Sequence, residues 1–466
     1  MSVKYRNSKT TTKILALAAI LMLLFSTGKS SYASFTIEDE NKLGKEFYEK
    51  LKSKDLFRKN PKVTDYMNNL GQKILSHSKK SPFNFTFSVI KSSGINAFAT
   101  PGGYIYVYEG LIKLVENESQ LAGVLAHEIA HVKSRHIADT IEKSQKIAMA
   151  TLVAILAGAF LGGGAEGAAA ITSFSMATAT TLNLKYSRQH EEEADRKGMR
   201  YMVSAGYDGR GMLDFLRIMR RYEYYSNSIP SYFLTHPGTG DRIRYLDGLL
   251  QTKYTKRGSV SIIGNLNRIK TTLVLGKKNL NSSLKYFQNA LTKSPDDVDF
   301  LYGLAVTQGR MGQATESLKN FSRALQQSPH DEDILRDLGI TCYKTGKTKD
   351  AIKFLRQAYA INKNDSDTIL YLGRSYETLT DLFTALDLYE KFQRDNPDDI
   401  NIYYSLAMTY GKVNNSGDSH YNFGIYFKKK NKPKSALFHF KAALNHFPPE
   451  TERGKVIQKE INSLNN

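Results

Sequence analysis

The sequence has 466 residues, of which 41% are hydrophobic, which is enough for two or three domains with ordinary cores. Its formal charge of +20 favours anionic membrane surfaces or acidic partners. Nucleic acid is not expected as a partner, because no recognised nucleic-acid motif accompanies the charge. Cys342 is the only cysteine, which excludes an intramolecular disulfide.

Residues 1–33 have the pattern of a secretory signal peptide. A basic stretch precedes an apolar run from Ile14 to Phe25, and Ser31-Tyr32-Ala33 offers a small-x-small cleavage site. An uncleaved anchor is the alternative, although the apolar run is short for a bilayer span. The pattern predicts export, and peripheral contact with a membrane stays open.

The segment from residue 35 to 108 is expected to change from helix to strand. Apolar residues recur at helical spacing up to residue 80, and Phe83 to Val89 then alternate with polar residues as in a half-buried strand. Two further strands, Ile95–Ala99 and Tyr104–Tyr108, flank a Pro-Gly-Gly turn. These patterns predict a small antiparallel sheet.

The predicted strand Ile95–Ala99 is a candidate substrate-binding site. A sheet edge can bind an extended peptide through main-chain hydrogen bonds, which tolerates many sequences. We expect Asn96, Ala97, Phe98 and Ala99 to form such an edge beside the helix that follows. A purely structural hairpin is the alternative.

The stretch from Gln120 to His136 contains H-E-x-x-H, formed by His127, Glu128 and His131. On a helix, residues four apart lie on one face, so the two imidazoles can share one Zn²⁺. Glu128 stands between them, where it can take a proton from a water molecule at the metal. The alternative is an amphipathic helix that happens to present two histidines.

Residues 147–182 are almost uncharged and rich in alanine, glycine and leucine. A glycine cluster interrupts the run, so the pattern favours an apolar helical hairpin that packs over the active site or enters a membrane surface. A transmembrane span and an ordinary core hairpin are the alternatives, since nineteen uncharged residues from Ile147 to Ala165 approach a spanning length.

A third metal ligand is expected about sixty residues after His131. Glu191 and Asp195 are four residues apart and therefore share a helix face. One of them can bind the metal while the other hydrogen-bonds a ligand histidine and so sets its tautomer. A solvated acidic helix face is the alternative reading, and it is the one expected for Glu192 and Glu193.

H-E-x-x-H followed by S-R-x-x-E-x-x-A-D resembles the HtpX and CAAX-prenyl-protease family of zinc metallopeptidases, which are gluzincins. The segments from Asn96 to Gly103 and from Thr235 to Ile243 are also similar to that family, and together the resemblance covers roughly residues 40–250. It implies that Glu191 is the third zinc ligand and that Asp195 is the closing aspartate of the motif.

Two residues in the last of these segments have open roles. His236 could hydrogen-bond the oxyanion of the tetrahedral intermediate with Arg242 in support, which would place both in the catalytic machinery. His236 could instead occupy the open coordination position and hold the enzyme inactive. A Pro-Gly turn whose arginine forms a surface salt bridge is the third reading.

From about residue 261 the chain repeats with a period of 34 residues. Leu304, Leu338, Leu372 and Leu406 fall on this grid, each followed by alanine or glycine. Such a period is the tetratricopeptide signature, which predicts a helical solenoid with a concave surface for peptides or proteins. The register slips after Asn414, which we interpret as an extra helix or half-repeat before a terminal unit.

The sequence thus predicts an α+β, mainly helical zincin-type metallopeptidase domain at 34–260, with a small antiparallel sheet, and an all-α tetratricopeptide-repeat solenoid at 261–466. Peptidases of this family joined to such repeats resemble the exported beta-barrel assembly-enhancing protease group. That resemblance implies one Zn²⁺ per chain, protein or peptide substrates, and the outer-membrane assembly machinery as a partner. A repeat-based periplasmic chaperone with a capped or inactive metal site is the rival hypothesis.

Overall fold

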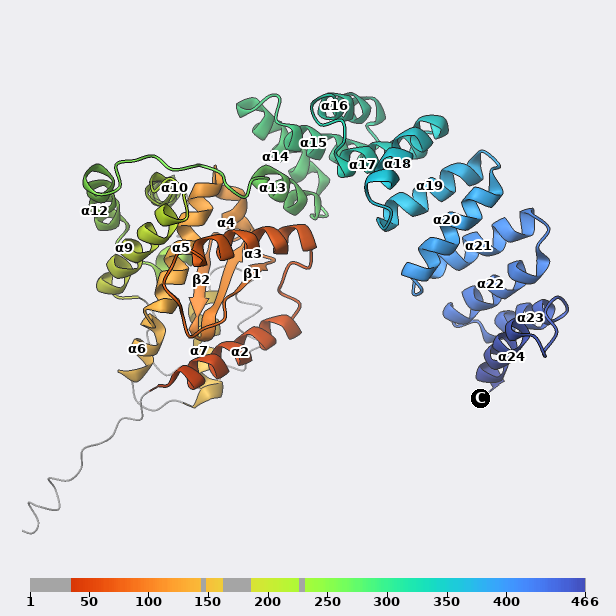
Figure 1. The fold of residues 1–466 in the computed structure, drawn as a ribbon, viewed down its shortest axis with the longest axis horizontal. Coiled ribbons are helices and arrows are strands. Elements are labelled where there is room, and N and C mark those ends of the chain that lie inside the picture. The colour runs from red at the N-terminus through yellow and green to blue at the C-terminus, as the bar shows by residue number, and fades with distance from the viewer. Residues whose placement is uncertain (1–34, 144–147, 162–185, 226–230, 466) are drawn as a thin grey trace, which may run out of the picture. The chain divides into compact units, whose positions relative to one another are not determined.

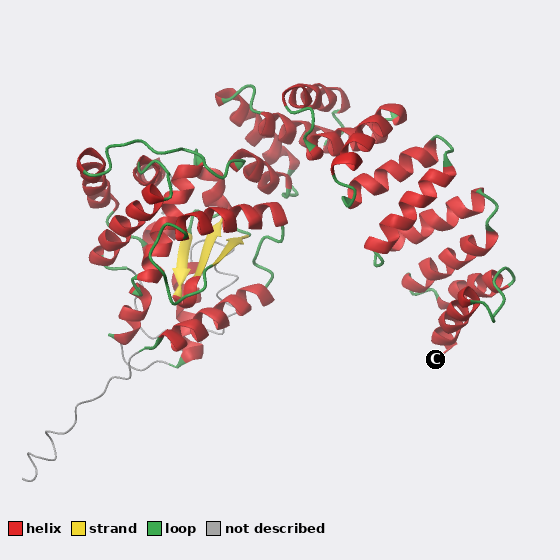
Figure 2. Ribbon diagram, in the orientation of Figure 1, coloured by secondary structure: helices red, strands yellow, loops and turns green. Residues whose placement is uncertain are grey.

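The computed structural model describes residues 35–143, 148–161, 186–225 and 231–465, and the chain divides into two compact units, Met1–Leu266 and Asn267–Asn466 (Figure 1). The predicted signal peptide lies outside the described residues, and so does the second half of the predicted apolar hairpin. Figure 2 shows strands set among helices in the first unit and helices throughout the second, which confirms the predicted fold class.

The first unit is built mainly from helices. In chain order its elements are α2 (Ile37–Ser53), α3 (Pro61–Leu75), β1 (Thr86–Ile90), β2 (Ala97–Thr100), the 3-10 turn η1 (Pro101–Gly103), β3 (Tyr104–Tyr108), α4 (Glu109–Leu114), α5 (Glu118–Lys133), α6 (His136–Glu142), α7 (Met149–Leu161), α9 (Arg188–Ser204), α10 (Arg210–Tyr225), α11 (Ser231–Thr235) and α12 (Thr239–Thr252).

The small sheet is present, but it is mixed rather than antiparallel. Its strand order is β1-β3-β2, with β2 antiparallel to β3 and β1 parallel to β3. The antiparallel prediction was therefore wrong for β1. Strands that follow each other in sequence often pair, but here β3 lies between β1 and β2 and leaves β2 at an edge of the sheet.

Two consecutive glycines make the turn between β2 and β3 possible. Gly102 and Gly103 have φ of 82° and 95°, a region that side chains disfavour. A Cβ on Gly103 would also lie 2.5 Å from the carbonyl oxygen of Asn84, so the turn packs directly on the neighbouring backbone. The tight turn holds β2 and β3 in register beside α5, which packs against β2.

Helix α7 is the described part of the predicted apolar hairpin, and it packs in the core of the first unit. Its residues Leu156 and Phe160 are fully buried, and Phe160 stacks on Phe98 with ring centroids 4.6 Å apart. Asn96 and Tyr108 each donate a side-chain hydrogen bond to the carbonyl oxygen of Phe160 at 3.1 Å. Across the described residues, no helix combines the length and apolarity needed to span a bilayer.

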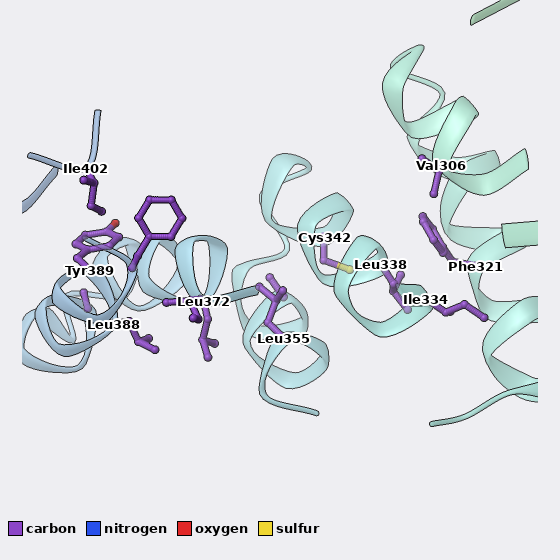
Figure 3. Close-up of a cluster of buried hydrophobic side chains, with 14 of the residues drawn as sticks. Val306, Phe321, Ile334, Leu338, Cys342, Leu355, Leu372, Leu388, Tyr389 and Ile402 are labelled. Atoms are coloured by element: carbon purple, nitrogen blue, oxygen red, sulfur yellow. The ribbon is translucent and has the colours of Figure 1, made fainter. Parts of the chain in front are cut away.

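The second unit is a series of antiparallel helix pairs. Its helices are α13 (Leu266–Leu275), α14 (Leu280–Lys293), α15 (Val298–Arg310), α16 (Ala314–Gln327), α17 (Glu332–Lys344), α18 (Thr348–Ile361), α19 (Ser366–Thr378), α20 (Leu382–Asp395), α21 (Ile400–Lys412), α22 (Ser416–Lys429), α23 (Pro433–Leu444) and α24 (Glu452–Asn465). Figure 3 shows how side chains from successive pairs, from Val306 to Ile402, form one continuous buried core.

The small residues of the 34-residue grid explain how the paired helices approach each other. A Cβ on Gly339 would lie 2.6 Å from Leu355 in the partner helix, and a Cβ on Gly373 would lie 2.8 Å from Tyr389. In both pairs the glycine precedes its partner by sixteen residues. The glycine leaves room for a large side chain of the second helix. The two helices of each of these repeats therefore pack against each other in the same way.

The register slip after Asn414 has a structural cause, because α22 belongs to two pairs. As the second helix of one pair, α22 places Ser419 at a spacing of 34 residues from the buried Ala385 of α20, and the hydroxyl of Ser419 donates a 2.8 Å hydrogen bond to Ala407 O. As the first helix of the next pair, it places Gly424 against Phe440, sixteen residues on, where a Cβ would lie 2.4 Å from the ring. Helix α22 accordingly packs against both α21 and α23.

Candidate metal centre

Helix α5 holds the H-E-x-x-H residues in the middle of the first unit. It begins at the N-cap Asn117, whose side chain accepts a 3.1 Å hydrogen bond from the backbone N–H of Gln120. Every residue from Glu118 to Val132 is buried, so α5 is a central helix rather than an amphipathic surface helix. Its histidines therefore lie in a region from which water is largely excluded.

A glycine on α9 brings the expected third ligand to these histidines. A Cβ on Gly198 would lie 3.0 Å from the backbone of Ala126 and His127, so α9 and α5 touch along their main chains at this point. The first turns of α9 then place Glu191 and Asp195 beside α5. This close approach explains why two segments sixty residues apart share one site.

Four buried side chains converge on one point. The Nε2 atoms of His127 and His131 are 2.9 Å apart, and Glu191 lies 3.5 Å from the first and 3.4 Å from the second. Nδ1 of His236 is 3.3 Å from His127 Nε2 and 3.1 Å from Glu191 Oε1. One ligand atom from each residue lies within 4.8 Å of all the others, which is the only such metal-compatible group among the described residues.

The chemistry of these donors fits zinc. Two or three imidazole nitrogens and one carboxylate are the ligands that zinc peptidase sites use, and the set is too rich in nitrogen for Mg²⁺ or Ca²⁺. Within the described part of the chain, both carboxylate oxygens of Glu128 and Nε2 of His236 are buried without a hydrogen-bond partner. Buried polar atoms of this kind are costly unless a bound species satisfies them.

Asp195 contacts one of the two histidines, as its predicted orienting role would require. Its Oδ1 lies 2.8 Å from Nδ1 of His127, which leaves Nε2 of that histidine directed at the metal group. Burial and the charge of Arg242 oppose protonation of His127, but the carboxylates of Asp195 and Glu191 outweigh them and raise its pKa to about 9.

Arg242 is buried and contacts both carboxylates of the site, Asp195 and Glu191. It does not lie in an exposed turn. It donates two 2.8 Å hydrogen bonds to Asp195, and its Nη1 lies 2.6 Å from Glu191. Burial opposes the charge of Glu191, but Arg242 and His236 outweigh burial and hold the pKa of Glu191 well below its usual range. The surface-salt-bridge reading of Arg242 is excluded, since the residue is only 3% exposed.

Glu128 lies beside the metal-compatible group and forms no salt bridge with a lysine or arginine among the described residues. It is fully buried, and its Oε1 is 3.5 Å from His236 Nε2. Burial raises the pKa of Glu128, while His236 and His127 act in the opposite direction. A raised pKa brings a carboxylate closer to the range in which it can both accept and return a proton at neutral pH.

Three further side chains complete the surroundings and were not singled out from the sequence. Tyr186 stacks on His131 with ring centroids 3.7 Å apart, and Tyr232 stacks on His236 at 4.4 Å. His136 is 2% exposed, and its Nδ1 is 2.8 Å from Nδ1 of His131. No local motif marks these residues, since tertiary packing alone brings them to the site.

The segment from Asn96 to Ala99 lies along an outer strand of the described sheet, and all four of its residues are buried. The backbone N–H of Tyr108 donates to Asn96 O, so Asn96 and Phe98 face β3 with their main-chain groups. Alternation along an antiparallel ladder then directs the main-chain groups of Ala97 and Ala99 away from β3. The side chains of Asn96 and Phe98 are engaged with Phe160 and serve the core.

The first unit combines a buried H-E-x-x-H helix with a carboxylate from a second helix, which is typical of a metallopeptidase. The second unit is a helical solenoid, which is typical of a repeat domain. Residues 58–250 match the model of peptidase family M48, and this part of the chain is an M48 metallopeptidase domain. Residues 297–364 and 367–399 match models of the tetratricopeptide repeat. Both parts of the suspected family assignment are thereby confirmed.

Curated relatives have the same type of peptidase domain. The putative beta-barrel assembly-enhancing protease of Vibrio cholerae is 34% identical over 46% of this chain and 45% of its own length. The beta-barrel assembly-enhancing protease of Escherichia coli K12 is 34% identical over 45% of this chain and 43% of its own. Mitochondrial metalloendopeptidase OMA1 of Schizosaccharomyces pombe is 27% identical over 50% of this chain and 67% of its own length. The match thus spans less than half of either bacterial relative.

Proposed function

We propose that this chain is an exported zinc endopeptidase that cleaves proteins or peptides and uses its repeats to bind clients or an assembly partner. The observation that supports this most directly is Glu128, a buried carboxylate without a hydrogen-bond partner among the described residues, set between His127 and His131. A purely structural metal site has no need of a base at this position.

His127, His131 and Glu191 would hold the zinc, and Arg242 and Asp195 would hold Glu191 and His127 in place. Zinc, when bound, supplies Lewis acidity for the peptide carbonyl and acidifies the attacking water. Glu128 would take the proton of that water and later pass it to the nitrogen of the leaving amine. We assign Arg242 a positioning role, because its guanidinium is already engaged by two carboxylates.

The substrate would bind in extended form along β2. The main-chain groups of Ala97 and Ala99 are directed away from β3, and β2 packs against the metal helix α5. Main-chain pairing at this edge would place a peptide beside the site with little demand on its sequence. Asn96 and Phe98 would then act indirectly, by fixing the strand to the core.

Compartment and clients belong to the same proposal. The pattern of residues 1–33 favours export, here to the periplasm. The bacterial relatives are beta-barrel assembly-enhancing proteases, which favours clients that form β-barrels in the outer membrane. Peripheral membrane contact is part of this proposal, and carbonate extraction of membranes tests it: a protein that resists extraction would instead be integral.

The test uses the purified mature protein, its metal content and its cleavage of casein, for wild type and Glu128→Gln. We expect zinc in both and at least a ~100-fold loss of cleavage in the variant, the scale of a lost general base. Full cleavage by Glu128→Gln would overturn the mechanism. No zinc in either protein would favour a repeat-based chaperone.

A second candidate function is favoured by the position of His236. Its Nδ1 lies inside the metal-compatible group, so His236 could be a fourth ligand that caps the zinc, as the chaperone hypothesis requires. Zinc-loaded wild type without cleavage, together with cleavage by His236→Ala, would identify a capped peptidase. Loss of cleavage in His236→Ala from an active wild type would instead assign His236 to catalysis, where it would stabilise the oxyanion.

A further inference from the structure

We propose that His136 is a positioning residue for the metal ligand His131 and that Glu193 in turn sets the tautomer of His136. This inference rests on the proposed zinc site. His136 begins α6, just beyond the end of α5, and only 2% of its surface is exposed. Its Nδ1 is 2.8 Å from Nδ1 of His131, and its Nε2 is 3.3 Å from Oε2 of Glu193.

The tautomers follow from proton counting. His131 directs Nε2 at the metal group, so a metal there needs the lone pair of Nε2, and the proton of the neutral ring must lie on Nδ1. A 2.8 Å contact between two Nδ1 atoms then requires His136 to accept with Nδ1. Neutral His136 must therefore have its proton on Nε2, and that N–H points at the carboxylate of Glu193.

The outer end of this relay is also anchored. Lys197 forms a 2.5 Å ion pair with Glu193 and a 2.9 Å hydrogen bond with Ser134 at the end of α5. His190 stacks on His136 with ring centroids 4.3 Å apart and an interplanar angle of 9°, which covers one face of the ring. The orientation of His136 is thus held by α9 on one side and by α5 on the other.

The two ligand histidines are therefore oriented in different ways. His127 contacts the carboxylate of Asp195 directly, whereas His131 reaches the carboxylate of Glu193 through a second imidazole. Residues that orient metal ligands typically change metal affinity 10- to 100-fold when they are removed. We expect the relay of His136 and Glu193 to contribute on that scale.

The experiment measures zinc affinity by competition with a chromophoric chelator, and the visible spectrum of the Co²⁺-loaded full-length mature protein. His136→Ala should weaken zinc binding about 10- to 100-fold and alter the Co²⁺ spectrum. His136→Asn, whose amide oxygen can replace the accepting Nδ1, should restore affinity to within about tenfold of wild type. Glu193→Ala should show a smaller loss of affinity than His136→Ala.

Glu192→Ala is the matched control, because Glu192 is an exposed neighbour on the same helix that pairs with Arg196 instead. An unchanged zinc affinity and Co²⁺ spectrum in His136→Ala would overturn the inference, and so would equal losses in His136→Ala and His136→Asn. Should His136→Ala not fold, Glu193→Ala against Glu192→Ala decides. Absence of zinc from the wild type would overturn the proposed function itself, and the inference with it.

Discussion

The two units bury charged groups to different depths, and the deeper cluster belongs to the proposed metal site. In the peptidase unit the side chain of Arg242 is 4% exposed, and its partners Glu191 and Asp195 are 1% and 0% exposed. In the repeat unit the side chain of Arg268 is 14% exposed and bridges Asp299 and Asp331, which are 21% and 23% exposed. The deeper cluster is costly in itself and is understandable as a preorganised site.

Arg242→Ala should be the most damaging of the changes that test this comparison. It removes the guanidinium from two buried carboxylates, which costs about 3–5 kcal/mol in the metal-free protein. Arg268→Ala should cost less, about 1.5–3 kcal/mol, because its aspartates reach water. Urea unfolding of the two variants measures both free energies, and an equal loss would show that the depth of burial does not distinguish the units.

Removal of zinc should destabilise only the peptidase unit. A ligand present at 100 to 1,000 times its dissociation constant stabilises the folded state by about 2.7–4.1 kcal/mol, and chelation removes that contribution. Thermal unfolding with and without chelator should therefore shift the transition of the peptidase unit and leave that of the repeats in place. A shift of both transitions would contradict the assignment of the metal to His127, His131 and Glu191.

Gly424→Ala should destabilise the packing of α22 against α23 and so tests whether α22 is shared by two helix pairs. The added Cβ would lie 2.4 Å from Phe440, and overpacking of this kind costs about 1–3 kcal/mol. The control is Gly411→Ala in α21, where the Cβ meets Ser419 at an ordinary 3.4 Å and helix propensity should stabilise by up to about 1 kcal/mol. Limited proteolysis of α23 and α24 reports the difference, and equal resistance would argue against the shared helix.

Tyr186→Phe should have the smallest effect on stability. The hydroxyl of Tyr186 is buried without a hydrogen-bond partner among the described residues, and its ring alone stacks on His131. Removal of an unsatisfied buried hydroxyl relieves a desolvation cost, so we expect the metal-free protein to gain up to about 1 kcal/mol. A clear loss in a chemical denaturation experiment would reveal a partner for this hydroxyl.

The repeat unit and the metal helix were predictable because their signals are local. The pattern of a leucine followed by glycine or alanine, as at Leu338 and Gly339, repeats every 34 residues, and the helices that pack together are neighbours in sequence. His127 and His131 face the same side of any helix that contains them. The resemblance to known zinc peptidases added Glu191 and Asp195 as residues that act with this helix. Both predictions depend on spacing along the chain rather than on how distant segments meet.

Tertiary structure alone decided the pairing of β1 with β3, the burial of Arg242 and the position of His136. His136 follows His131 by five residues, which on a continuous helix would direct the two rings apart. Helix α5 instead ends at Lys133, Arg135 then adopts a left-handed φ of 57°, and α6 brings His136 back against His131. The contact between His136 and His131 depends on the backbone conformation at Arg135 and on the packing of α9. The periodicity of the sequence predicts neither of these features.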